Sequence, residues 1–158
     1  MSCIVDVATE GIRVPLARWR AAAIARAVLR AEGVDSARLS VTFVTTPRII
    51  ALNRTHLRRR GATDVIAFGF VRRAVSEPVV GDIYIAPDVA RRNAVENGVS
   101  MREELARLVV HGVLHTLGFD HPDGVARMGS AMWRRQEALL RRMTRRVGGE
   151  RRHRARAA

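Results

Sequence analysis

The most constraining feature of this sequence is a long apolar segment in its C-terminal half. From Leu105 to Phe119 the only polar side chains are Arg107, His111, His115 and Thr116. A helix that is apolar on almost every side must be surrounded by the rest of the protein, so we expect this segment to form a central, buried helix. The two histidines that it carries therefore need partners inside the core.

The sequence also marks the ends of this helix. Ser100 followed by Glu103 predicts a capping box, in which each side chain satisfies a free backbone N–H at the helix start. Gly118 follows the last apolar residues, and glycine readily takes the left-handed conformation that ends helices. The chain can then turn back and bring His121 to the end of the helix.

The hydrophobic periodicity of the remaining chain predicts alternating strands and helices. We expect strands at residues 3–8, 39–45, 64–70 and 82–86, and helices at about 15–31, 46–57, 87–96, 101–117 and 123–142. This order predicts an α/β (α+β) fold with a mixed four-stranded sheet packed with about five helices. Residues 1–143 would form the domain, and residues 144–158, too polar and charged to pack, a basic and disordered tail.

Composition restricts the class of protein further. A chain of 158 residues is expected to form one domain. No apolar run approaches the roughly 20 residues of a membrane span, and the N-terminus has no secretory signal pattern. We therefore expect a cytoplasmic protein without membrane contact. Cys3 is the only cysteine, which excludes an internal disulfide and a thiolate metal cluster.

The charge of the chain is strongly positive. Its formal net charge is +13, and all 28 basic residues are arginine. Arginine makes planar, bidentate contacts to phosphate, so nucleic acid is the first partner to consider. The alternative, that this charge serves solubility alone, stays open on composition.

The histidine spacing predicts a metal site. His111 and His115 are four residues apart, so they lie on one helix face one turn apart, and the turn at Gly118 lets His121 join them. Three protein ligands with an open fourth position are typical of catalytic zinc, whereas structural zinc usually has four. We expect one Zn²⁺ per chain, which would acidify a water and supply a nucleophile.

A zinc protease of this spacing would carry a glutamate where this chain has Gly112. Asp120 is a candidate catalytic residue, with the orientation of a ligand imidazole as its simplest role, and Asp123 is expected to cap the next helix. A phosphodiesterase has less need of a carboxylate base, because a phosphate oxygen can share the proton handling. A nearby carboxylate would also repel a phosphate substrate.

Three blocks of the sequence resemble one known family. HGVLHTLGFDH (111–121) is similar to the HGxLHLxGYDH signature of the YbeY family, bacterial zinc-dependent endoribonucleases and rRNA maturation factors. LNRTHLRRRGATDVIAFGF (52–70) resembles the family's LNxxY…PTDVLSFPF block, and GDIYIAPDVA (81–90) resembles GDIxIxxDxA. The resemblance covers roughly residues 35–142.

The resemblance implies a single-strand endoribonuclease that matures the 3′ end of 16S rRNA and acts in ribosome quality control. Its expected partners are rRNA of the small subunit and a ribosomal protein or GTPase. The zinc ligands carry over to His111, His115 and His121. A family arginine thought to contact the scissile phosphate corresponds to Leu57, and three arginines follow it: Arg58, Arg59 and Arg60.

Physical chemistry supports a role for those arginines without the family. A guanidinium that holds phosphate oxygens stabilises the negative charge of a transition state, so Arg58 and Arg59 are candidate catalytic residues. Together with Arg60 they are also candidate RNA-binding residues. A solvated basic turn is the alternative for each of them.

Two other functions stay open. A zinc peptidase of related metal geometry would need an acidic base near the metal. A non-enzymatic, ribosome-associated RNA-binding factor would use its metal to staple the fold. The sequence leaves zinc and nickel as possible occupants of the site.

Overall fold

A computed structural model describes residues 2–156, and the side chains of all of these except Val125 and residues 146–156. The helices and strands follow in this order: β1 (Ser2–Thr9), α1 (Arg18–Ala31), β2 (Ser36–Phe43), α2 (Thr46–Leu57), β3 (Val65–Gly69), β4 (Val79–Ile85), α3 (Pro87–Asn97), α4 (Met101–Thr116), the 3₁₀-helix η1 (Gly124–Gly129) and α5 (Ala131–Arg156).

The four strands form one mixed sheet in the order β1-β2-β4-β3. Strand β2 pairs in parallel with β1 on one side and with β4 on the other, and helical connections make these crossovers possible. Strand β3 pairs antiparallel with β4, because the two strands follow each other with a short connection. Strand β3 is therefore an edge of the sheet.

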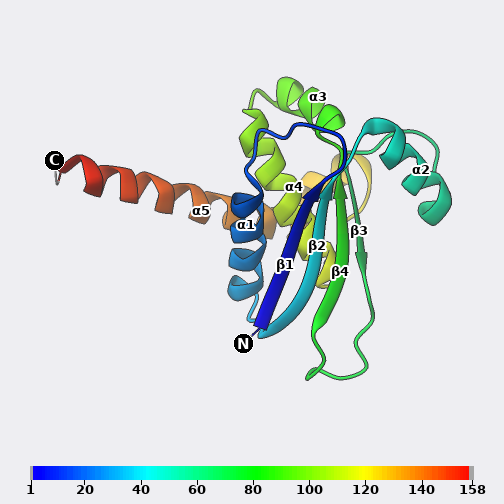
Figure 1. The fold of residues 1–158 in the computed structure, drawn as a ribbon, viewed down its shortest axis with the longest axis horizontal. Helices are drawn as coiled ribbons and strands as arrows, with labels where there is room; N and C mark the ends of the chain where they lie inside the picture. Colours follow the sequence, from blue (N-terminus) through cyan, green and yellow to red (C-terminus); the bar gives the residue numbers. More distant parts are fainter. Residues whose placement is uncertain (1, 157–158) are drawn as a thin grey trace.

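One face of the sheet carries the main core. Alternate side chains of β2 are buried, and they share this core with apolar residues of α1 and α4. Figure 1 shows α4 passing behind strands β2 and β4. A smaller core joins α2 to the other face, where Ile49 and Leu52 pack with Ile66. The apolar segment around the two histidines is thus a central helix, as its composition predicts.

The predicted fold class is confirmed: one domain, a mixed four-stranded sheet and five α-helices. The predicted last helix is wrong in its start, because a 3₁₀-helix ends at Gly129 and α5 begins at Ala131. Ser130 separates them. Its backbone is extended, and its Oγ accepts a hydrogen bond from the backbone N–H of Trp133 at 3.2 Å. Asp123 precedes η1 but makes no side-chain cap.

The predicted end of that helix near Arg142 is also wrong. Helix α5 runs on to Arg156, so the backbone of residues 144–156 is helical where composition predicts a disordered tail. Arginine, glutamate and alanine have high intrinsic helix propensities. The sequence-based prediction considered only whether this segment could pack against the rest of the protein. In Figure 1 this end of α5 projects away from the sheet. Residues 157 and 158 lie outside the described residues, and the domain boundary at residue 143 stays a prediction.

Among the helices of residues 2–156, none combines the length and the apolar character that crossing a membrane requires.

Candidate metal centre

Helix α4 positions the first two histidines. Ser100 caps its start as predicted, because the Ser100 Oγ accepts a hydrogen bond from the backbone N–H of Glu103 at 3.1 Å. The Glu103 carboxylate lies 3.7 Å from the Arg107 guanidinium, and no described hydrogen bond returns it to Ser100, so the predicted box is half formed. The helix ends at Thr116, and Gly118 turns the chain with a φ of +94°.

The three histidines converge at the end of this helix. One ring nitrogen from each of His111, His115 and His121 lies within 4.8 Å of the others. The Nε2 atoms of His111 and His121 are 3.3 Å apart, and the ring centroids are separated by 4.6 to 5.0 Å. The convergence expected from the spacing is therefore present, built by one helical turn and the bend after it.

The partners of the remaining ring nitrogens determine which atoms face the centre. The Nδ1 of His121 lies 3.0 Å from the carbonyl oxygen of Pro122, which can only accept a hydrogen bond. The ring therefore donates from Nδ1, and its Nε2 carries a lone pair. The Nδ1 of His111 lies 2.6 Å from the Oε1 of Gln136, which imposes the same tautomer. Two lone pairs thus face each other, an arrangement that a cation would relieve.

Burial keeps these rings in the form that binds metal. It lowers the pKa of His111 to about 3, against the opposing effect of the hydrogen bond with Gln136. Burial also lowers the pKa of His115, and the neighbouring His121 adds to this effect. Neutral imidazole is the ligand form of histidine, so His111 and His115 need lose no proton at pH 7 to bind a metal ion. The donor set fits a metal ion that prefers nitrogen ligands.

Sequence reasoning missed Gln136, which orients His111. Its side chain is 1% exposed. Its Nε2 donates to the Glu137 carboxylate at 3.3 Å, and this leaves the Oε1 for the histidine. A signal was present, because Gln136 is a polar residue at helical spacing between Met132 and Leu139 on the buried face of α5. A polar side chain on such a face needs a buried partner.

The missing protease glutamate has a packing explanation. Gly112 faces the sheet, and a Cβ built there would lie 2.6 Å from the Cγ2 of Ile83 on β4. One helical turn after Gly112, Thr116 lies equally close to the sheet. A Cβ built at Gly81 of β4 would lie 2.6 Å from the Cγ2 of Thr116. Helix α4 thus lies against β4 without room for a side chain at residue 112. A side chain at this position would require Ile83 to move.

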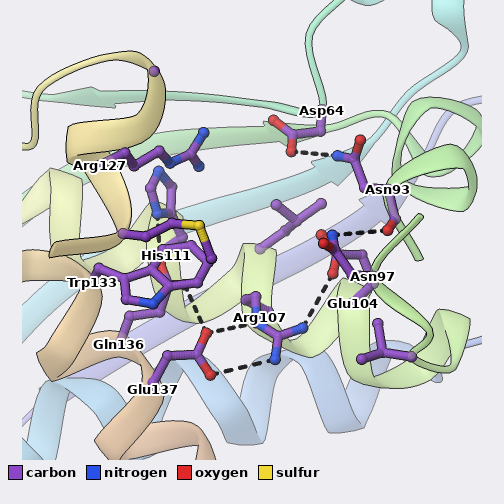
Figure 2. Close-up of a pocket in the computed structure, with 14 residues that line it drawn as sticks. Asp64, Asn93, Asn97, Glu104, Arg107, His111, Arg127, Trp133, Gln136 and Glu137 are labelled. Carbon is purple, nitrogen blue, oxygen red and sulfur yellow. Dashed lines mark hydrogen bonds and ion pairs between the residues drawn. The ribbon is translucent and has the colours of Figure 1, made fainter. Parts of the chain in front are cut away.

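A groove of about 560 Å³ leads away from His111. It is bordered by α3, α4, η1 and α5 and by Asp64, which precedes β3. In Figure 2 its floor is a set of paired charges, where Arg107 bonds Glu104 at 3.1 Å and Glu137 at 2.7 Å. Asp64 accepts a hydrogen bond from Asn93 at 2.9 Å on the opposite wall.

Arg127 is a second arginine of this groove that sequence reasoning missed. It lies on η1, and in Figure 2 it reaches over the His111 ring on the side of Asp64. Its Nε is buried and has no hydrogen-bond partner in the described part of the chain. Burial raises the pKa of Asp64, and the charge of Arg127 opposes this. No pattern in the sequence separates Arg127 from the other arginines.

The other predicted site residues lie on the surface. The Asp120 carboxylate accepts a hydrogen bond from the backbone N–H of His121 at 2.8 Å, so it stabilises the turn. The hydrogen-bond partners of the His111 and His121 rings are instead Gln136 and the Pro122 carbonyl. Arg58, Arg59 and Arg60 are exposed after α2, with Arg58 in the left-handed conformation at a φ of 50°. They do not line the groove. Their catalytic and RNA-binding roles stay predictions.

Comparison with known sequences identifies relatives of this chain. The profile of a family described as endoribonuclease YbeY matches residues 7–144. Among proteins named endoribonuclease YbeY, one from Geobacter metallireducens is 35% identical over 140 residues, 87% of this chain and 91% of the relative. One from Bacillus licheniformis is 40% identical over 134 residues, 77% of this chain and 84% of the relative. One from Parasynechococcus marenigrum is 43% identical over 111 residues, 67% of this chain and only 59% of the relative.

A solved structure supports the same fold. The solution structure of TM1509 from Thermotoga maritima matches with a TM-score of 0.58 and 23% identity, over 95% of this chain and 93% of that chain. The resemblance found in the three sequence blocks is confirmed by the profile and by relatives that align along most of the chain. On this evidence the chain belongs to the YbeY endoribonuclease family.

Proposed function

We propose that this protein is a single-strand-specific, zinc-dependent endoribonuclease. It would act in rRNA processing, at the 3′ end of 16S rRNA, and in ribosome quality control in the cytoplasm, with a ribosomal protein or GTPase as a further partner. Family membership supports the reaction class. The observation that carries the proposal is the convergence of the three histidines, with the Nε2 atoms of His111 and His121 3.3 Å apart and a ring nitrogen of His115 within 4.8 Å of the others.

The chain supplies the geometry of the reaction. When bound, zinc would supply a Lewis acid that lowers the pKa of a water to near 7. The three imidazoles would hold it, with Gln136 and the Pro122 carbonyl fixing the ring orientation of His111 and His121. Gly112 leaves no carboxylate base beside His111, so a phosphate oxygen of the substrate would take part in proton handling.

The charge of the protein supports an RNA substrate. A net charge of +13 attracts a polyanion from solution, and its effect depends on salt. Arg58, Arg59 and Arg60 are exposed and available to phosphates of a strand that approaches the groove. We propose that they bind the RNA backbone and that Asp120 supports the ligand turn rather than the reacting atoms.

The two rival functions fit the site less well. A zinc peptidase of this spacing uses a glutamate as its base at the position where this chain has Gly112. A structural zinc usually has four protein ligands, and the cluster contains three histidines with no fourth histidine, cysteine or carboxylate within the described residues.

Replacing His115 by alanine tests the proposal. The zinc content of the purified variant should fall, and cleavage of a single-stranded RNA should fall by roughly a thousandfold, the scale of an essential catalytic group. The melting temperature of the metal-free protein should change little, because His115 is half-buried. Arg102→Ala, on an exposed residue of the same helix, is the matched control and should retain zinc and activity.

The same assays separate the rivals. Cleavage of casein by the zinc-loaded protein, abolished by chelator, would replace the nuclease with a peptidase. A wild-type protein that binds zinc and RNA but cuts neither RNA nor protein would leave the metal a structural role. Both results contradict the proposal.

A further inference from the structure

We propose that Arg127 binds the scissile phosphate of the substrate beside the three histidines. The inference rests on the proposed endoribonuclease function and adds an anion-binding position to it. Its ligand class is a phosphodiester of single-stranded RNA.

Arg127 occupies the right place for such a contact. It lines the same groove as His111, and the element that carries it, η1, begins three residues after His121. Figure 2 shows the side chain directed into the groove above His111. An anion held by Arg127 would therefore lie next to the histidine nitrogens.

The guanidinium is also uncommitted. Arg107, the other arginine of the groove, lies within 4.0 Å of three carboxylates, those of Glu103, Glu104 and Glu137. No such ion pair within the described residues includes Arg127, and its buried Nε has no hydrogen-bond partner there. A buried donor without a partner is costly, and substrate phosphate would satisfy it. Arginine suits this ligand because its planar fork bonds two phosphate oxygens at once.

The acids of the groove have other partners. Asp64 accepts a hydrogen bond from Asn93 at 2.9 Å, and no ion pair within the described residues joins it to Arg127. Glu104 and Glu137, the other acids of the groove, are both held by Arg107. The guanidinium of Arg127 is thus the free cation of the groove within the described residues, whereas Arg58, Arg59 and Arg60 lie outside it.

The test compares Arg127→Gln with Arg92→Gln in the full-length protein. Arg92 is exposed on α3, next to the groove residue Asn93, and its replacement removes the same charge. Arg127→Gln should lower the kcat for cleavage of a single-stranded RNA about a hundredfold, as loss of one transition-state donor does. Arg92→Gln should change it less than about twofold. Melting temperatures should show that both variants fold.

Two further measurements exclude a merely structural role. Free guanidinium ion at millimolar concentration should restore part of the activity of Arg127→Gln and none of His115→Ala. In chelator, where no cleavage occurs, RNA binding of Arg127→Gln should weaken about tenfold, the scale of one charge-assisted contact.

The outcomes also separate this inference from the proposed function. The role of Arg127 is overturned, and the nuclease proposal stands, if the wild type cleaves RNA and Arg127→Gln has the same kcat as the wild type. The same conclusion follows if Arg92→Gln loses as much activity as Arg127→Gln. Wild-type protein that does not cleave RNA overturns the nuclease. If Arg127→Gln also binds RNA in chelator as tightly as the wild type does, the proposed contact between Arg127 and the phosphate is disproved as well.

Discussion

The two ends of the groove treat charge in opposite ways. At the end near the start of α4, Arg107 bonds Glu104 at 3.1 Å and Glu137 at 2.7 Å, so the charges are matched inside the protein. At the other end, the Nε2 atoms of His111 and His121 face each other at 3.3 Å, and the buried Nε of Arg127 has no partner in the described part of the chain.

This difference distinguishes structure from function within one cavity. Folded proteins pair nearly all of their buried polar groups, and the paired end follows that rule. The exceptions gather where a ligand completes the bonding, and the unpaired end collects donors and acceptors suited to a cation and an anion. The paired end should therefore respond to mutation through stability, and the unpaired end through binding and catalysis.

The largest effect on stability is expected at the contact between helix α4 and strand β4, which positions the histidines of the unpaired end. Gly112→Glu would restore the glutamate of a zinc protease, but its side chain has to enter the space of Ile83, whose Cγ2 would lie 2.6 Å from the new Cβ. Overpacking together with a buried carboxylate should lower the free energy of unfolding by at least about 3 kcal/mol. Urea unfolding would measure this loss. Gly129→Ala, where a Cβ meets nothing within 4 Å, is the control. A stable Gly112→Glu protein would contradict the packing argument.

The paired end should fail through folding. Arg107→Ala leaves the buried Glu104 carboxylate without its partner, and breaking such a pair costs about 3 kcal/mol of unfolding free energy. The folded fraction should still bind zinc with wild-type affinity. Arg127→Ala should cost less than about 1 kcal/mol, because it breaks no described ion pair. Equal losses of stability in the two variants would remove the distinction between the ends.

The orientation of His111 should matter for metal affinity rather than for folding. Gln136→Leu removes the 2.6 Å hydrogen bond to the His111 Nδ1 and keeps an apolar side chain in a buried position. Loss of such a support weakens metal binding by about 10- to 100-fold. Competition with a chelator would measure the zinc affinity. Met132→Leu, one turn earlier on the same face, should bind zinc like the wild type, and wild-type affinity in Gln136→Leu would contradict the role of Gln136.

The smallest predicted effect is a pH dependence of the metal-free protein. Folded His111, with a pKa of about 3, stays neutral while the unfolded chain takes up a proton below its ordinary value of 6.5. Stability should therefore fall as the pH drops below 6.5, by about 1 kcal/mol between pH 7.5 and 5.5. The raised pKa values of Asp64 and Glu104 act in the opposite direction. His111→Gln retains both acids and therefore serves as the control. If its stability depends on pH as steeply as that of the wild type, His111 is not the cause of the pH dependence.

The features that packing dictates were the ones that the sequence allowed us to predict. The apolar surroundings of His111 and His115 required a central helix, and Ser100 and Gly118 fixed its ends. The period of four then placed both rings on one side. Each of these conclusions depends on burial and local backbone geometry, which leave a direct pattern in a sequence.

The unpredicted features depend on contacts between distant segments. Gln136 meets His111 across 25 residues, and Arg127 lies on η1, a separate 3₁₀-helix that Ser130 divides from α5 where the sequence predicts one continuous helix. The arginines that the sequence favoured, at residues 58–60, lie outside the groove. A run of consecutive basic residues does not reveal which part of the protein its side chains face. Among so many arginines, only the fold distinguishes Arg127, whose Nε is buried and has no hydrogen-bond partner in the described part of the chain.

The most direct test of the central claim is a crystal structure of the full-length protein grown with zinc. We predict one zinc per chain bound by the Nε2 atoms of His111 and His121 and by a ring nitrogen of His115, each at about 2.0 to 2.1 Å, with solvent or a substrate phosphate as the fourth ligand. Rings that turn away from one another, or a fourth side chain on the metal, would contradict the account of a hydrolytic centre.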